Sequence, residues 1–291
     1  MEQRPRPAAA LYVVATPIGN LGDITLRAVE TLRQVEWVLA EDTRRTRSLL
    51  SHLGISKPVT RVDAHSSPAT LQGIVAKIAL GQPAALVTDA GVPAVSDPGA
   101  LLVAAATQGG VTVVPVPGAS AVTAAVSVSG FSGGTFFFFG FLPRKGKERK
   151  DALDRLCAMT DSVVLLESPH RCQATLADLA ERTPERQILV ARELTKLNEE
   201  LARGTAAELA VRSDWRGEIT LVLGPKDALA SAPLDELGLN DAIAERLLQG
   251  QTARVISAEL AVRFSQPRRE VYERVLALRS KHLEGEPSDD E

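Results

Sequence analysis

The residues best suited to hold a small molecule lie in three loops, at 16–23, 89–99 and 115–120, each of which follows a predicted strand. All three loops combine proline with glycine. Proline fixes φ and has no amide proton, whereas glycine allows left-handed geometry and the close approach of another group. Such segments keep main-chain amides and carbonyls free of regular pairing, and a loop ordered in advance loses less entropy when a ligand binds. The three loops therefore predict a small-molecule site.

Two carboxylates in the 89–99 loop have different expected roles. Asp97 stands directly before Pro98, as a helix N-cap stands before a proline in the first turn, so capping is its favoured role. Asp89 follows the end of a strand and precedes Gly91, where fewer structural roles are available. A carboxylate there can accept a hydrogen bond from a ribose hydroxyl or an amine. We expect Asp89 to contact the ligand.

Basic residues at two places are candidates for binding phosphate. Arg44 and Arg45 follow a strand end beside the predicted site, whereas Arg47 is typical of a solvated surface arginine. Five further basic residues fall within 144–150, directly after an aromatic strand, where a loop could cover a substrate. Basic residues beside aromatic ones favour RNA as the partner without specifying it.

A third cluster closes another predicted strand and opens a helix, and it contains Glu167, His170 and Arg171. Ser168 and Pro169 match the N-cap and the first helical position. The glutamate, the histidine and the arginine have no such capping role, so we expect them to line the site from a second domain.

Several common kinds of site are missing from the sequence. The first strand is not followed by the G-x-G-x-x-G fingerprint of dinucleotide-binding folds, and the G-x-x-x-x-G-K-[ST] phosphate loop does not occur. The four histidines are far apart, and the two cysteines form neither a metal knuckle nor a redox pair. We therefore expect no metal and no nicotinamide, flavin or nucleoside triphosphate cofactor.

The segments between these loops alternate between strand and helix as far as residue 129. Short apolar runs predict strands, and apolar residues at helical spacing predict helices. The expected strands are 11–16, 37–40, 59–62, 84–88 and 111–116, and the expected helices begin at 23 and cover 43–53, 69–80, 98–108 and 120–129. This order is typical of a parallel or mostly parallel α/β sheet, which binds ligands at the carboxyl ends of its strands.

The pattern changes after residue 129, where a second domain is expected. Its predicted strands are 136–139, 162–167, 188–192 and 218–223, with helices over 148–159 and 169–181. A polar linker at 225–233 leads to three helices at 240–249, 252–264 and 268–279, whose spacing is compatible with a helix-turn-helix module. Residues 1–10 and the acidic residues 284–291 are expected to be disordered.

The chain has 291 residues, of which 45% are apolar and 24% charged, as in ordinary globular proteins with more than one domain. Its net charge of −3 argues against a surface coated in positive charge, although a local basic patch can exist under that total. The sequence shows no apolar signal core near its start and no apolar run long enough to span a membrane. We therefore expect a cytoplasmic protein with no membrane partner.

The motifs together resemble a known family. They are ATPIGNLGDIT at 15–25, AEDTR at 40–44, TDAGVP at 88–93, SDPG at 96–99, PVPGA at 115–119, GFLP at 140–143 and ESPHR at 167–171. The combination resembles the bacterial 16S rRNA (cytidine-2'-O)-methyltransferases of the tetrapyrrole methylase superfamily. The resemblance covers residues 11 to about 225, and the last helices are similar to the C-terminal helix-turn-helix extension of that family.

The resemblance implies a two-domain tetrapyrrole-methylase-like α/β fold, divided into 11–125 and 126–225, with a small helical extension at 234–283. It implies S-adenosylmethionine bound between the two α/β domains, usually in a homodimer. It also implies methyl transfer to the ribose 2'-hydroxyl of a cytidine in the decoding region of 16S rRNA, on the small ribosomal subunit. By motif, the implied cofactor contacts are Ile18, Asp89, Gly91, Val92, Ser120 and Ala121. By charge and position only, the RNA contacts are Arg44, Arg45, Lys145, Lys147 and Arg171.

A ribose hydroxyl is a poor nucleophile until its proton leaves, so this reaction calls for a positioned base or a cation that stabilises the oxyanion. The base candidates, which the sequence does not rank, are Glu41, Asp42, His65 and Glu167.

Two alternatives stay open from the sequence. A methyltransferase of the same superfamily that acts on a tetrapyrrole or a protein side chain would keep the cofactor loops but would not need the basic 144–150 loop or the final helices. A non-enzymatic regulator would sense a metabolite with its α/β part and bind nucleic acid with those helices.

Overall fold

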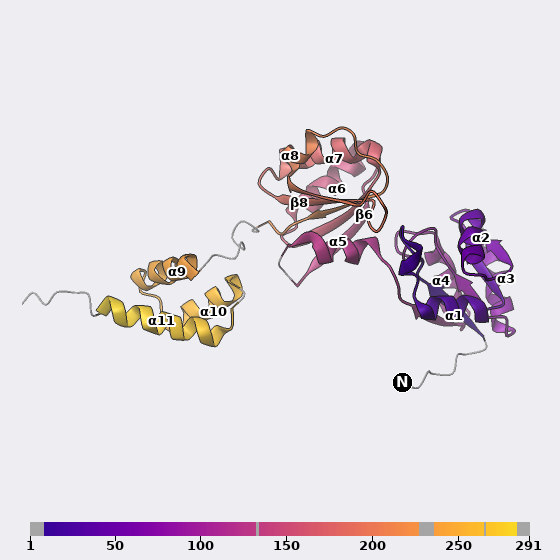
Figure 1. Cartoon of the computed structure of the whole chain (residues 1–291), viewed down its shortest axis with the longest axis horizontal. Helices are drawn as coiled ribbons and strands as arrows, with labels where there is room; N and C mark the ends of the chain where they lie inside the picture. The colour runs from indigo at the N-terminus through magenta and orange to yellow at the C-terminus, as the bar shows by residue number, and fades with distance from the viewer. Residues whose placement is uncertain (1–8, 132–133, 227–235, 265, 284–291) are drawn as a thin grey trace, which may run out of the picture. The chain divides into compact units, whose positions relative to one another are not determined.

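The computed structural model describes residues 9–131, 134–226, 236–264 and 266–283, of which 236–237 and 280–283 are described by their backbone alone. Contacts divide the chain into two compact units, Met1–Gly224 and Pro225–Glu291, called unit 1 and unit 2 below (Figure 1). The linker expected at 225–233 and the disordered ends expected at 1–10 and 284–291 fall largely outside the described residues. Ala10 is an exception, because it is fully buried at the start of the first strand.

Unit 1 begins with a sheet of five parallel strands, in the order β3-β2-β4-β1-β5. The strands are β1 (Ala10–Val14), β2 (Trp37–Ala40), β3 (Val59–Arg61), β4 (Ala84–Leu86) and β5 (Thr112–Val116). The connecting helices are α1 (Leu26–Gln34), α2 (Thr43–His52), α3 (Pro68–Ala79) and α4 (Gly99–Gln108). The predicted parallel α/β sheet is confirmed.

Alternate residues of each strand enter different cores, because successive side chains point to opposite faces of a sheet. Tyr12 packs with Leu32 of α1 and Leu50 of α2, whereas its neighbour Leu11 packs with Ile78 of α3 and Leu102 of α4. Both faces of the sheet are therefore covered by helices, and the carboxyl ends of the strands are left to carry the loops.

The second sheet of unit 1 has the order β6-β7-β10-β8-β9, in which β6 and β7 are parallel and the other pairs antiparallel. Its strands are β6 (Phe136–Phe141), β7 (Ser162–Glu167), β8 (Gln187–Arg192), β9 (Glu200–Thr205) and β10 (Ile219–Leu223). The helices that cover it are α5 (Ala121–Ser129), α6 (Gly146–Ala158), α7 (Pro169–Arg182) and α8 (Ala206–Ala210). Neither β9 nor α8 is among the elements expected from the sequence.

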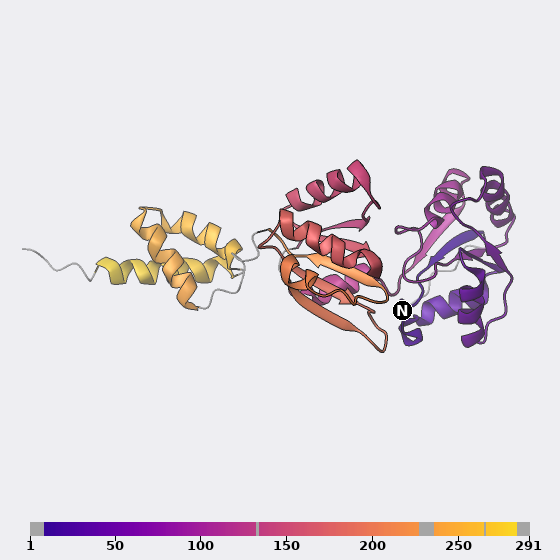
Figure 2. The same cartoon turned by 90° about the horizontal axis from the view of Figure 1, so that it is seen from above.

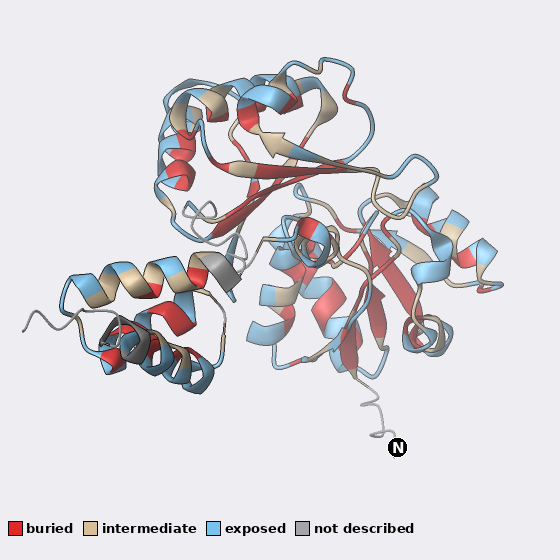
Figure 3. Cartoon of the chain, turned by 60° about the vertical axis from the view of Figure 1, so that its left-hand side comes forward, coloured by how far each residue is buried: buried red, intermediate tan, exposed pale blue. Residues whose placement is uncertain are grey.

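Helix α5 lies on one side of this second sheet, and α6, α7 and α8 lie on the other (Figure 1). Ala125 of α5 packs against Val164, Leu189 and Val222 of the sheet. The domain boundary predicted at residue 125 therefore falls inside a helix that packs on the second sheet, and the division of unit 1 into two domains stays a prediction. Figure 3 shows the strands of both sheets as the most buried part of the unit.

Unit 2 contains α9 (Glu236–Leu248), α10 (Ala253–Arg263) and α11 (Arg268–Leu283), which Figure 2 shows from a second side. These helices have a core of their own, in which Leu239 and Ile243 of α9 meet Ile256 and Leu260 of α10 and Val275 of α11. The three C-terminal helices predicted from the sequence are confirmed. In the part of the chain that the structure describes, no helix combines the length and the apolar character needed to cross a membrane.

Candidate active site

A cavity of about 540 Å³ in unit 1 is lined by the loops of the first sheet and by the ends of β6, β7 and β10 in the second. The six residues predicted to contact a cofactor all line it, namely Ile18, Asp89, Gly91, Val92, Ser120 and Ala121. The structure thus brings together residues from three separate loops, as expected where parallel strands end at one edge of a sheet.

The 89–99 loop is held in an unusual backbone shape. Gly91 has a φ of 80°, and two non-glycine residues, Ala94 and Ser96, also have positive φ values of 67° and 56°. Gly91 exchanges backbone hydrogen bonds with Thr16 of the first loop, with N···O distances of 2.9 and 3.1 Å. Non-glycine residues are uncommon in this conformation and tend to gather at binding sites.

The prediction that Asp97 is the N-cap of a helix is wrong, although its carboxylate does order the loop before that helix. Its Oδ1 accepts hydrogen bonds from the amides of Gly99 at 2.8 Å and Ala94 at 3.4 Å, and its Oδ2 accepts one from the Thr88 hydroxyl. Helix α4 begins at Gly99, however, so Pro98 occupies the N-cap position in place of Asp97. Asp97 both organises the loop and lines the cavity.

The first loop packs closely against the loop that follows β8. A methyl group at Gly19 would lie 2.8 Å from the Thr195 hydroxyl and 3.0 Å from the Leu194 carbonyl, and it would also meet the Lys196 side chain. Only glycine leaves room for this approach, because a Cβ atom needs more than 3.0 Å. Loops from the two sheets of unit 1 therefore touch next to Ile18, which lines the cavity.

Carboxylates are concentrated on the cavity wall, where Glu41, Asp89 and Asp97 all contribute. Partial burial raises the pKa of Glu41, and the negative charges of Asp97, Asp89 and Asp63 raise it further. Asp89 pairs with Arg45 at 3.6 Å, which places one of the predicted phosphate-binding arginines at the rim of the cavity.

Two of the four base candidates lie away from the cavity lining. Asp42 is the N-cap of α2, where it accepts hydrogen bonds from the amides of Arg44 at 2.8 Å and Arg45 at 3.4 Å. The first of these hydrogen bonds is the main cause of its lowered pKa. His65 is exposed in the loop between β3 and α3 and does not line the cavity. The structure does not bring either residue to the predicted site.

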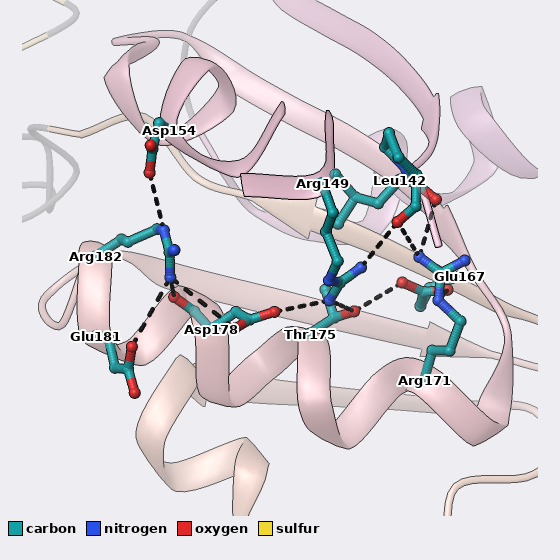
Figure 4. Close-up of polar contacts among 10 residues, drawn as sticks. Leu142, Arg149, Asp154, Glu167, Arg171, Thr175, Asp178, Glu181 and Arg182 are labelled. Atoms are coloured by element: carbon teal, nitrogen blue, oxygen red, sulfur yellow. Dashed lines mark hydrogen bonds and ion pairs between the residues drawn. The ribbon is translucent and has the colours of Figure 1, made fainter. Parts of the chain in front are cut away.

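Glu167 lines the cavity but is only 4% exposed, and both of its oxygens already have partners. Oε1 accepts a hydrogen bond from the Ser168 amide at 2.8 Å and pairs with Arg171 Nε at 3.3 Å. Oε2 accepts one from the Thr175 hydroxyl at 2.7 Å (Figure 4). A carboxylate held in this way positions α7 against β7, and it is poorly placed to take a proton from a substrate.

Arg171 continues this network to the loop after β6. Its Nη2 donates to the carbonyls of Leu142 at 2.9 Å and Pro143 at 3.1 Å, and Arg149 joins the same loop to Thr175 and Asp178 (Figure 4). The guanidinium of Arg171 is therefore committed to positioning the 142–143 turn. Lys145 and Lys147, predicted with it as RNA contacts, are exposed beyond that turn. Arg44 is also exposed and pairs with Asp42 at 3.5 Å.

Two groups of residues beside the cavity were not predicted from the sequence. Gly217 and Glu218, directly before β10, and Thr220 within it line the cavity, and no local motif marks them. A second hollow shares Ile18 and Ser120 with the cavity, and its lining includes five further polar side chains, those of Asp23, Thr25, Thr123, Ser127 and Thr195. Within the described residues, the buried hydroxyl of Thr195 has no hydrogen-bond partner. The spacing of Ser120, Thr123 and Ser127 on one helix face is the signal that could have identified this hollow.

No group of three or more His, Cys, Asp or Glu side chains arranged to hold a metal ion occurs among the described residues.

The sequence model for tetrapyrrole (corrin/porphyrin) methylases matches residues 10–210. The chain belongs to this family. The family resemblance drawn from the sequence motifs is thereby confirmed.

Relatives in this family carry the name ribosomal RNA small subunit methyltransferase I. The one from Synechocystis sp. is 41% identical over 272 residues, which cover 92% of this chain and 98% of the relative. The one from Bacillus subtilis is 38% identical over 273 residues, or 90% and 92% of the two chains. The one from Thermotoga maritima is 45% identical over 220 residues, which are 99% of its own length but 75% of this chain.

Solved structures of tetrapyrrole methylases share the fold at low sequence identity. Diphthine synthase superposes with a TM-score of 0.59 at 15% identity, covering 74% of this chain and 90% of its own. Uroporphyrin-III C-methyltransferase from Thermus thermophilus, complexed with S-adenosylhomocysteine, gives a TM-score of 0.53 at 18% identity, covering 76% and 99%. The predicted two-sheet α/β architecture is the architecture of these methyltransferases.

Proposed function

We propose that the protein is an S-adenosylmethionine-dependent methyltransferase of the small-subunit ribosomal RNA, and that it methylates the ribose 2'-hydroxyl of a cytidine in 16S rRNA. The observation that carries the proposal is the single cavity that gathers all six motif-derived cofactor residues. The names of the relatives supply the RNA substrate, and the sequence motifs supply the 2'-hydroxyl of cytidine.

The residues of the cavity fit this cofactor. Its volume of 540 Å³ lies in the range of small-molecule sites, roughly 300–1,000 Å³. The carboxylates of Glu41, Asp89 and Asp97 complement the positive sulfonium and ammonium groups, and they can accept hydrogen bonds from ribose hydroxyls. Ile18 and Val92 offer apolar cover for the base. When bound, the cofactor supplies a methyl group that its sulfonium already activates.

The remaining task of the protein is to align the accepting hydroxyl and to remove its proton. Among the four base candidates, Glu41 lines the cavity. Its carboxylate forms no hydrogen bond or ion pair with other described residues, so it is available to a substrate. The raised pKa of Glu41 lies closer to neutral pH than that of an ordinary glutamate. A general base works best when its pKa is near the pH at which the enzyme operates. We assign the proton-accepting role to Glu41.

The experiment that tests the proposed function is transfer of a tritiated methyl group from S-adenosylmethionine to 30S particles that lack the modification. Label should appear on a cytidine ribose of 16S rRNA. Label on a tetrapyrrole or a protein side chain would identify another methyltransferase of the family. Cofactor binding by calorimetry without transfer to any acceptor would favour the metabolite-sensing regulator.

The same proposal includes a cytoplasmic location, because the substrate is the small ribosomal subunit, and a homodimeric assembly. Analytical ultracentrifugation of the full chain tests the assembly, because a dimer has twice the 31.0 kDa mass of a single chain. A monomer that transfers methyl groups at the full rate would refute the dimer without affecting the proposed activity.

A further inference from the structure

Unit 2 carries a positively charged hollow of about 420 Å³ between the first turns of α10 and α11. It is lined by Arg254, Ser257, Arg268, Arg269 and Tyr272. All three arginines are exposed, and the ring of Tyr272 is 40% exposed. Arg268 Nη2 donates to the carbonyl of Arg254 at 3.4 Å, so these two arginines stand side by side across the two helices. We call this set of residues the arginine hollow.

The chemistry of the arginine hollow suits a phosphate backbone. A guanidinium presents planar pairs of N–H donors that match two phosphate oxygens, and it does not lose its charge. Arg268 and Arg269 lie in the first turn of α11, where the helix dipole favours an anion and where Glu270 already supplies one carboxylate. An exposed tyrosine ring beside these charges can stack on a base. A basic hollow with an aromatic wall is the combination expected for single-stranded or irregular RNA.

One carboxylate competes for these charges. Arg269 pairs with Glu273 at 3.0 Å, but both side chains are largely exposed, at 90% and 63%. Exposed ion pairs of this kind contribute little, about 0–1 kcal/mol, so a phosphate can replace the carboxylate at low cost. The ion pair leaves Arg269 at the surface.

The arginine hollow is not needed to build the methylase fold. The core of unit 2 consists of its own helices, and the relative from Thermotoga maritima is matched over 99% of its length by 220 residues of this chain. That length is close to the 224 residues of unit 1. A feature that the family fold does not require, and that concentrates positive charge in a chain of net charge −3, calls for a separate role.

We propose that the arginine hollow is an RNA-binding surface, through which unit 2 holds the phosphate backbone of the rRNA substrate. This inference rests on the proposed function, because it takes the small-subunit rRNA as the partner. Unit 2 contributes affinity for the particle, while the cavity of unit 1 carries the chemistry.

The test uses the full chain and two charge-matched double variants. The first is Arg254→Gln with Arg269→Gln, which removes two charges from the hollow. The second, the control, is Arg263→Gln with Arg279→Gln, which removes two exposed arginines of unit 2 that do not line the hollow. The dissociation constant for 30S particles is measured at several salt concentrations, together with kcat and KM for methyl transfer and the affinity for S-adenosylmethionine.

The hollow variant should bind 30S particles about tenfold more weakly and show a correspondingly higher KM, with kcat and cofactor affinity unchanged. The slope of log Kd against log salt should fall by about 1.4 to 1.8, because each lost phosphate contact accounts for roughly 0.7 to 0.9. The control should stay within about twofold of the wild type, since dispersed surface arginines contribute only general attraction.

Equal losses in the two variants, or no loss in either, would overturn the inference. Tighter binding to duplex DNA than to rRNA would overturn it in favour of a DNA partner. Failure of the wild type to transfer methyl to rRNA would instead refute the proposed function, and this outcome is read from a separate assay. Thermal unfolding checks that the variants are folded, and the single change Arg269→Gln, at a 90% exposed side chain, provides a milder form of the test.

Discussion

Glu41 is the residue that we propose as proton acceptor, and partial burial beside three carboxylates raises its pKa. Changing Glu41 to Gln keeps the shape of the side chain but removes the basic oxygen, so kcat should fall about 100-fold or more, the usual contribution of a general base. The affinity for S-adenosylmethionine should change little. In the wild type, the rate should rise with pH through a pKa above the ordinary value of 4.5, and the variant should lack this rise. Rates measured from pH 4 to 9 distinguish the two profiles.

Removing the Glu41 carboxylate should lower the activity but raise the stability of the fold at high pH. Because the pKa of Glu41 is higher in the folded protein, its contribution is fully present at low pH and is lost as the pH rises through that value. At neutral pH the ionised carboxylate therefore opposes folding, and the Glu41→Gln variant should unfold at a higher temperature than the wild type at pH 8. The two proteins should unfold at nearly the same temperature at pH 4. A variant that is less stable at pH 8 would contradict the view that burial and the neighbouring carboxylates make the ionised form of Glu41 unfavourable.

Variants of Asp89 and Arg45 can separate the proposed cofactor contact of Asp89 from its ion pair with Arg45. Asp89→Asn should weaken S-adenosylmethionine binding by about tenfold or more, since a hydrogen bond to a charged group contributes roughly 1.5–3 kcal/mol. Arg45→Gln also breaks the 3.6 Å ion pair but leaves the carboxylate in the cavity. We expect this second variant to bind the cofactor almost normally by calorimetry. Equal weakening in both variants would show that Asp89 acts only through Arg45.

At the scale of elements, Glu167 joins β7, α7 and the turn at 142–143. Glu167→Ala leaves Arg171 and the Thr175 hydroxyl without this partner, and the side chain that is lost is only 1% exposed. Breaking a buried pair costs about 3–5 kcal/mol, and Arg171 recovers part of this because it can reach water, so we expect a loss of about 2–3 kcal/mol. Urea unfolding measures the free energy.

Asp154 provides the matched control for this change. Its carboxylate pairs with Arg182 at 3.1 Å in the neighbouring part of the network, but its side chain is 55% exposed (Figure 4). Asp154→Ala should cost less than about 1 kcal/mol, because exposed ion pairs contribute little. If the two variants lose the same stability, the buried network does not hold the elements together as described.

The elements themselves were predictable wherever apolar periodicity was strong. Strand β7 covers Ser162–Glu167, the same residues that the sequence predicts. Helix α1 begins at Leu26 and not at 23, because Asn20 caps a short 3-10 turn over Leu21–Asp23. Strand β9, Glu200–Thr205, escaped prediction because it is a half-buried edge strand without an alternating apolar pattern.

The candidate site was predictable to the extent that it is local in sequence. Its loops follow parallel strands, and each can be recognised from its own prolines and glycines. The contribution of β10 depends on an antiparallel pairing that sets Ile219 opposite Glu167, 52 positions away along the chain. No local pattern reports such a pairing. The hydrogen bonds that already occupy Glu167 and Arg171 could not be predicted for the same reason. The type of a residue gives its charge, but it does not give the groups that the residue contacts in the fold.

At the scale of the whole molecule, the separate cores predict that unit 1 can work alone. A chain ending at residue 224 should fold and bind S-adenosylmethionine with the affinity of the full chain, because the described residues that line the cavity belong to unit 1. The same chain should bind 30S particles at least tenfold more weakly, as the arginine hollow is removed. Calorimetry and particle binding measure the two affinities. A truncated chain that aggregates or ignores the cofactor would show that the units depend on each other.

The positive φ values at Ala94, Ser96, Glu193 and Thr195 have a practical consequence for engineering. Each left-handed residue of this kind costs about 1–3 kcal/mol, and these four flank the place where the two sheets meet. Substitutions that relieve this backbone strain should be among the simplest ways to raise the unfolding temperature. Such variants would relax the rim that shapes the cavity, so thermal tolerance and catalytic competence should trade against each other in this enzyme.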